Sequence, residues 1–153
     1  MHPTRNDLPA RWRGRLEERL NQRLADALDL EAATKQAHWN VKGPNFIALH
    51  GNVEEHVDTI AERIAALGGT ALGPIAAVAR SSSLAPYPED LSAGANHLTA
   101  LADRLANFGR KVRAAIATAA KLADADSSDL FTAVSRDVDK YLWSLEAHLH
   151  ADH

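Results

Sequence analysis

The sequence contains no cysteine, and this absence removes a whole group of chemistries. A chain without thiols has no disulfides, no thiolate metal site and no cysteine nucleophile. The same absence suits a reducing compartment such as the cytoplasm. Aromatic residues are also scarce, at 5% of the chain, and the hydrophobic 46% consists largely of alanine and leucine. Such a composition favours closely packed helices over strands.

Long apolar runs and a strongly basic charge are missing as well. No stretch has the length needed to cross a membrane, and the first residues lack the apolar segment of a signal peptide. We therefore expect a soluble, intracellular protein with no membrane partner. The net charge of −3 argues against a globally basic nucleic-acid binder. At 153 residues, the chain is long enough for one domain with a proper core.

Apolar residues recur at steps of three and four along most of the chain, which is the period of a helix packed in a bundle. The predicted starts of the four main helices are Ala10, a position between 46 and 52, residue 91 or 92, and Asp129. The second helix closes at Gly68-Gly69 and is short for its partners. A short helical piece over 75–80 lies in the crossover that follows it. Ser127 or Ser128 is the expected N-cap of the fourth helix.

These elements predict an all-α fold, a four-helix bundle with a short extra helix in the crossover between the second and third helices. The bundle forms a single domain over residues 10–151. Residues 1–9 contain two prolines and little to bury, so we expect them to form a flexible arm.

Four polar residues of the second helix step by four and therefore share one face. They are His50, Glu54, Asp58 and Glu62. Three acids and an imidazole on one face repel each other unless a cation or a basic partner neutralises them. An apolar stripe runs beside them, so we expect part of the row to lie at a buried edge. His38 lies where the apolar stripe of the first helix turns polar. Imidazole and carboxylate without thiol suit Fe, Mn or Zn, so the pattern predicts a metal site; a solvated helix face is the alternative.

Several motifs together resemble the Dps family of mini-ferritins, the DNA-binding proteins from starved cells. They are TKQAHWNVKGPNF, HVDTIAERIAALGG, the PYP of the crossover and SRDVDKYLWSLEAHL. The resemblance covers roughly residues 15–150. It implies a ferritin-like bundle that assembles as a hollow homo-dodecamer in the bacterial cytoplasm or nucleoid. Such proteins oxidise Fe(II), preferably with hydrogen peroxide, and store the Fe(III) product in the cavity.

The resemblance also implies a ferroxidase site across a two-fold dimer interface. One subunit would contribute His38 and His50, and the other Asp58 and Glu62. Trp39 and Trp143 match tryptophans near that site, although either alone reads equally well as a packing residue. Acidic pore residues of the family have counterparts in the predicted turn before the fourth helix, where helix capping is the alternative role. These candidates are Asp124, Asp126 and Asp129.

The match breaks after His50, which stands only eight residues before Asp58. A typical member would carry about seven more residues here. Removing seven residues turns a helix by about 700°, which preserves the face, but shifts the axis by about 10 Å. Three explanations stay open: a rebuilt corner, a segment missing from the sequence, or an impaired site. Glu54 and His56 are candidate replacement ligands.

Any binding of DNA should be weak. The arm and the start of the first helix carry four arginines, but neither end has the lysine-rich tail with which the family neutralises phosphates. Binding should strengthen as histidines become protonated in mildly acidic solution. Two alternatives to an iron-oxidising cage stay open. One is a DNA-covering cage with an impaired ferroxidase site, and the other is a bundle that binds a metal such as Zn without oxidation.

Overall fold

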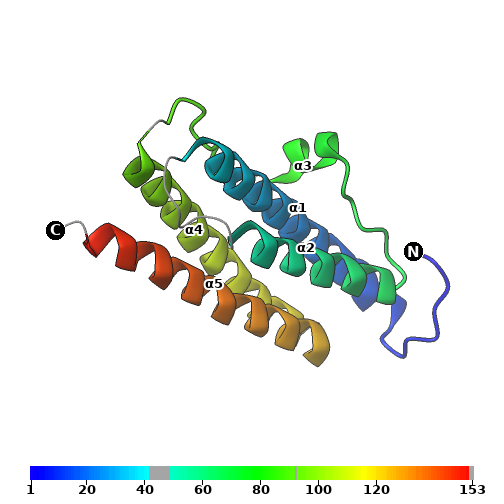
Figure 1. The fold of residues 1–153 in the computed structure, drawn as a ribbon. Helices are drawn as coiled ribbons and strands as arrows, with labels where there is room; N and C mark the ends of the chain where they lie inside the picture. Colours follow the sequence, from blue (N-terminus) through cyan, green and yellow to red (C-terminus); the bar gives the residue numbers. More distant parts are fainter. Residues whose placement is uncertain (42–48, 92, 152–153) are drawn as a thin grey trace.

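A computed structural model describes residues 1–41, 49–91 and 93–151, except for the side chains at 49, 50 and 151. Within these ranges the chain forms five helices and no strand (Figure 1). They are α1 (Ala10–Asn40), α2 (Leu49–Ala66), α3 (Ile75–Ser81), α4 (Gly94–Lys121) and α5 (Ala125–Ala151). The four long helices form a bundle, and α3 lies in the crossover between α2 and α4. The predicted all-α bundle with one short extra helix is confirmed.

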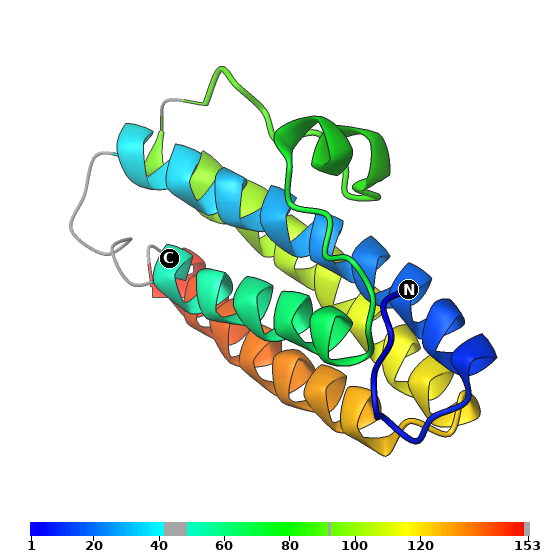
Figure 2. The ribbon, with the colours of Figure 1, turned by 90° about the vertical axis from the view of Figure 1, so that its right-hand side faces the viewer.

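The bundle consists of two helix pairs packed side by side. α4 and α5 form a hairpin, α1 packs against α2, and α1–α4 and α2–α5 contacts join the two pairs. The crossover leaves the end of α2, carries α3 along the outside of α1 and returns to the far end of the bundle (Figure 2). No helix in the described ranges is long and apolar enough to cross a membrane.

The core lies between the four long helices, where the predicted apolar stripes face inward. Its fully buried large side chains include Leu16, Leu20, Leu24, Leu30, Ile60, Ile64, Leu101, Leu105, Phe108 and Phe131. Burying each of these contributes about 1.5–3 kcal/mol. Gly109 allows a close approach between α4 and α5, because a Cβ at this position would stand 3.2 Å from a methyl group of Val138. The close contact at this point therefore depends on the absence of a side chain.

The second helix is short, as predicted: α2 has 18 residues, against 31, 28 and 27 in α1, α4 and α5. Its C-terminus is closed by a Schellman motif. Gly68 has φ +80, its N–H bonds to the Ala65 carbonyl at 2.9 Å, and the Gly69 N–H bonds to the Ile64 carbonyl at 2.9 Å. Only glycine adopts this left-handed conformation without strain. The predicted stop at Gly68-Gly69 is confirmed.

The N-terminal arm contacts this same end of α2. The His2 N–H bonds to the Gly68 carbonyl at 2.5 Å. The Arg13 guanidinium donates to the carbonyls of Leu67 and Leu8, each at 3.0 Å. The end of α2 is therefore held by α1 and the arm together. The predicted flexibility of the arm stays a prediction.

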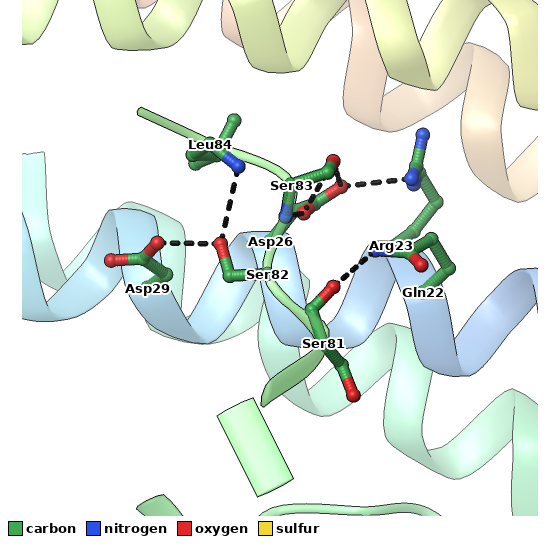
Figure 3. A network of polar contacts seen from close by, with 8 residues as sticks. All are labelled: Gln22, Arg23, Asp26, Asp29, Ser81, Ser82, Ser83 and Leu84. Carbon is green, nitrogen blue, oxygen red and sulfur yellow. Dashed lines mark hydrogen bonds and ion pairs between the residues drawn. The ribbon is translucent and has the colours of Figure 1, made fainter. Parts of the chain in front are cut away.

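Polar contacts fasten the crossover along α1 (Figure 3). The buried Asp26 carboxylate accepts a 2.7 Å bond from the Ser83 N–H and pairs with Arg23 at 2.9 Å. One turn further along, Asp29 accepts a 2.5 Å bond from the Ser82 hydroxyl. The serine run of the crossover thus attaches to α1 by hydrogen bonds to two carboxylates.

The PYP motif attaches the next part of the crossover to α4. The Tyr87 hydroxyl lies 2.8 Å from Nδ1 of His97, which is buried. The Arg104 guanidinium lies 5.9 Å from the Tyr87 ring centre, donates to the Ala85 carbonyl and pairs with Asp29 at 2.8 Å. Burial raises the pKa of Tyr87, and Arg104 acts in the opposite direction. This motif therefore has a structural role, because it holds the crossover against α4.

The start of the fourth long helix differs from the prediction. α5 begins at Ala125, four residues before the predicted Asp129, so Ser127 and Ser128 lie inside the helix. Asp124 precedes the helix, its carbonyl accepts a bond from the Ser128 N–H at 3.1 Å, and its carboxylate accepts from the Ser127 backbone. The N-cap is therefore Asp124, and neither predicted serine has that role. The boundary was missed because α4 ends on a left-handed alanine, Ala123, with φ +57, where glycine would have marked the stop.

Candidate functional site

The acidic row of α2, which we define as Glu54, Asp58 and Glu62, is exposed in the single chain. The opposite side of the helix carries Val53 and Ile60, which are buried against the bundle. The helix is therefore amphipathic in the way the sequence predicts, but the expected buried edge for the acids is wrong for the isolated chain. Three exposed carboxylates at four-residue spacing repel one another, so this face gains free energy from any bound cation.

The two predicted histidine ligands lie on different helices. His38 is half-buried near the end of α1. His50 lies in the first turn of α2, and its side chain is outside the described part of the structure. Among the described residues, no group of three or more His, Asp and Glu side chains comes together to hold a metal. The described ligand candidates, His38, Asp58 and Glu62, thus lie on one bundle without forming a three-residue cluster within it.

The candidate replacement ligand His56 lies in the seam between α2 and α5. Its Nε2 is 3.4 Å from the Asp137 carboxylate and 3.4 Å from the Tyr141 hydroxyl. Burial lowers the pKa of His56, while Asp137 and Glu55 act in the opposite direction. Burial, with help from the same two carboxylates, raises the pKa of Tyr141 to about 12. His56 therefore contacts α5 and is buried, whereas the acidic row is exposed.

The other candidate replacement, Glu54, faces a basic neighbour. The Lys35 ammonium of α1 bonds to Glu31 at 2.5 Å, and the charge of Glu54 adds to that field. The pKa of Lys35 is raised first by the hydrogen bond and charge of Glu31 and then, more weakly, by Glu54. Lys35 belongs to the same TKQAHWN segment as His38. The start of the acidic row thus lies in the electrostatic reach of the end of α1.

An arginine next to the acidic row makes contacts that the sequence reasoning missed. The Arg63 guanidinium donates to the Asp124 carboxylate at 2.7 Å and to the Ser127 hydroxyl at 3.0 Å, and lies 3.7 Å from Asp126. These partners are 61 to 64 residues away in the sequence, and no local pattern predicts their pairing. The only available signal was a lone arginine at the end of a helix and an acidic turn with no assigned basic partner.

The three pore candidates have different surroundings. Asp124 is buried and performs the capping role described above, while Asp126 and Asp129 are exposed. Asp129 lines a surface pocket with Ser128 and Thr132 at the start of α5. The capping alternative is thus realised by Asp124, and the pore role of all three stays a prediction. Trp39 and Trp143 are both exposed in the single chain, and their proximity to the site also stays a prediction.

Comparison with known proteins places this arrangement in a family. The family model of the ferritin-like domain matches residues 17–152. A DNA protection during starvation protein of Agrobacterium fabrum is 45% identical, over 97% of this chain and 96% of its own length. The solved structure of DpsA14 from Streptomyces coelicolor has 35% identity and a TM-score of 0.87, over 95% of this chain and 90% of that one. A Mycobacterium smegmatis Dps has 29% identity and the same TM-score of 0.87, over 97% and 94%.

The alignment with the Agrobacterium protein also contains a difference in length. It runs over 155 positions, whereas 97% of the 153 residues of this chain is about 148. About seven aligned positions of the relative therefore have no counterpart here. A gap of that size is what a shortened segment after His50 would leave.

The match of the ferritin-like domain to most of the chain, the 45% identity to a DNA protection during starvation protein and the shared fold lead to one conclusion. This chain belongs to the Dps family of ferritin-like proteins.

Proposed function

We propose that this protein is a mini-ferritin that oxidises Fe(II), preferably with hydrogen peroxide, and stores the Fe(III) product inside a homo-dodecameric cage in the bacterial cytoplasm. The observation that carries the proposal is the exposure of Asp58 and Glu62 on one helix, apart from His38 on another. A metal site with these ligands needs a second subunit. An interface that joins the α1 end of one chain to the acidic row of another would supply both ligand types.

The proposed ligands suit iron as a substrate. Carboxylates supply hard, anionic oxygen donors and neutral imidazole supplies a nitrogen donor, a combination typical of non-haem iron. Asp58 and Glu62 would offset the charge of the cation, and His38 would complete the site from the other subunit. In the overall reaction, two Fe(II) ions each give one electron to hydrogen peroxide. The peroxide takes up two protons and becomes two water molecules. Consumption of both reactants together would protect DNA from hydroxyl radicals.

The position of the acids supports activity despite the shortened helix. Asp58 and Glu62 lie between the region after His50 and the C-terminal end of α2. The Schellman motif and Arg13 fix that end. A loss of about seven residues upstream would therefore change the place of His50 and leave the acids where they are. We infer that His38, Asp58 and Glu62 are the essential ligands and that His50 contributes least, with Glu54 available in its place.

Fe(II) oxidation by the metal-free protein tests the proposal. The intact mass is first compared with 16.5 kDa, to exclude a missing segment. With stoichiometric hydrogen peroxide, we expect rapid oxidation that saturates with Fe(II). The double variant D58A/E62A and the variant H38A should lose this oxidation, and H50A should retain most of it. The matched control is E55Q, because Glu55 is an exposed acid of the same helix outside the row.

A wild-type rate equal to that of buffer, with the mass confirmed, would contradict the proposal and favour the DNA-covering cage with an impaired site. A protein that binds Zn but leaves Fe(II) unoxidised would favour the bundle that binds a metal without oxidation. Anomalous scattering at the Fe and Zn edges distinguishes the two metals.

The arginines near the N-terminus bear on the proposed weak affinity for DNA. Arg11 and Arg15 lie 5.2 and 5.8 Å from the centre of the Trp12 ring, and Arg13 is bonded to backbone carbonyls. Three basic side chains are thus partly engaged within the chain. We expect any retardation of DNA by the cage to disappear with modest added salt, because so few phosphates would be neutralised.

A further inference from the structure

Arg63 joins the helix of the acidic row to the turn between α4 and α5. It follows Glu62 directly, and its side chain is only 15% exposed. Two of its nitrogens donate to different partners: Nη2 to Asp124 at 2.7 Å and Nε to the Ser127 hydroxyl at 3.0 Å. Because a guanidinium is planar and rigid, two bonds to two partners fix its orientation as well as its position.

The partner of Arg63 is a buried charge. The Asp124 side chain is 4% exposed. Burial acts to raise the pKa of Asp124, but the hydrogen bonds from Arg63 and Ser127 outweigh burial, and the pKa is lowered. The carboxylate is therefore ionised at neutral pH, and the pair is a charge-assisted one that is shielded from solvent. Such a pair weakens far less with salt than an exposed ion pair.

The rotation of α2 about its own axis determines where the carboxylates of Asp58 and Glu62 point. Side-chain ends lie about 5–6 Å from a helix axis, so a rotation of 10° moves them by about 1 Å. A misplacement of about 1 Å can lower a rate about 100-fold. The Schellman motif fixes where α2 ends, but a backbone cap at the axis resists rotation less than a side chain that reaches outward to another helix.

We propose that Arg63 is a positioning residue for the metal site of this protein: by bonding to Asp124 and Ser127 it sets the rotation of α2 and hence the direction of Asp58 and Glu62. The inference rests on the proposed function for its catalytic meaning. Arg63 contacts the α4–α5 turn and acts on the site through the helix. The shortened α2 makes this anchor more important, because the helix has fewer turns over which to pack.

Zinc titration and Fe(II) oxidation of the assembled protein test the inference. In R63Q, we expect the equilibrium affinity for Zn(II) and the apparent affinity for Fe(II) to fall by about 10–100-fold, the usual effect of removing a group that orients metal ligands. R63K keeps the charge but cannot bond to both partners in the same plane, so it should recover only part of the affinity. An equilibrium titration is insensitive to the rate of metal entry, which excludes an effect on a pore.

Two controls separate positioning from stability. V112A removes methyl groups from the buried part of α4, and R113Q breaks the exposed 2.8 Å pair between Arg113 and Asp139. V112A should lower the melting temperature and leave both metal affinities unchanged, and R113Q should change neither. Amide hydrogen exchange over residues 53–62 should rise in R63Q and stay unchanged in V112A.

Equal metal affinities in R63Q, V112A and the wild type would overturn the inference, as would unchanged exchange in α2 of R63Q. A wild type that binds Zn(II) but does not oxidise Fe(II) would overturn the proposed function alone. In that case a selective loss of Zn(II) affinity in R63Q would still support Arg63 as the residue that positions the metal ligands.

Discussion

The left-handed alanine at the end of α4 offers a sharp test of the backbone geometry. Ala123 has φ +57 and is exposed, and the chain reverses around it through bonds from the Ala123 N–H to the Ala120 carbonyl at 3.0 Å and from the Asp124 N–H to the Ala119 carbonyl at 3.1 Å. This is the Schellman pattern, with alanine at the position that normally carries glycine. We predict that A123G stabilises the protein.

The size of the gain follows from two opposing terms. A left-handed conformation costs a residue with a Cβ about 1–2 kcal/mol. Glycine is more flexible in the unfolded chain, which costs about 0.4–1 kcal/mol. The expected net increase in the free energy of unfolding is about 0.5–1 kcal/mol, or about 1–4 °C in melting temperature for a chain of this size. No packing is lost, because the methyl group is exposed.

Urea unfolding followed by circular dichroism, at one protein concentration, measures this change. The matched control is A117G, the same substitution at an exposed position inside α4, where helical φ favours alanine and the expected change is a loss of about 1 kcal/mol. The two variants should therefore shift in opposite directions. A loss of stability in A123G comparable to that in A117G would refute the left-handed assignment at the end of α4.

Three further predictions concern the interior. G109A should destabilise the protein by up to about 2 kcal/mol, because crowding of Val138 at 3.2 Å costs about 1–3 kcal/mol and the better helix propensity of alanine returns about 1 kcal/mol. Urea unfolding measures the net change, and a gain of about 1 kcal/mol would mean that Val138 yields to the new methyl group without cost. D26A should cost about 2–3 kcal/mol, because it leaves the half-buried Arg23 without its carboxylate and releases the Ser83 attachment. The same assay applies, and a cost below about 1 kcal/mol would mean that the crossover is held elsewhere. For His56, whose pKa is lowered in the folded state, the unfolded chain binds more protons, so stability should be full above the unfolded pKa of about 6.5 and fall as the pH drops below it. H56Q should lose this part of the dependence between pH 7 and 5, and an identical pH profile for wild type and H56Q would contradict the buried, neutral imidazole.

The sequence predicted the helices well because their apolar residues repeat at helical spacing. The end of α2 was also predictable, because a glycine pair, Gly68-Gly69, closes it. The sequence-based prediction failed at the start of α5, since alanine in a left-handed conformation leaves no compositional signal. It also placed all candidate ligands on helices that the structure contains. It expected part of the acidic row at a buried edge, whereas all three acids are exposed in the single chain, because periodicity gives the apolar side of a helix but not the width of its buried surface.

Long-range polar pairs were beyond the reach of the sequence for a different reason. Arg63 and Asp124 are 61 residues apart, and the bond between them depends on how α2 is rotated against the α4–α5 turn. Periodicity determines which side of α2 is apolar, but a range of rotations buries the same valines and isoleucines. The polar contact selects one of them, and only the folded arrangement reveals it.

The attachment of α2 at one end has a consequence for how such proteins can change during evolution. A helix whose C-terminus is held by a cap and by side-chain contacts tolerates insertions and deletions near its N-terminus, provided that they come in steps that keep the side chains in register. Seven residues are close to two whole turns, whereas a change of two or five residues would swing every upstream side chain to the far side of the helix. Length variation should therefore accumulate at the α1–α2 corner in units of about seven, and designers could lengthen or shorten this corner without rebuilding the rest of the bundle.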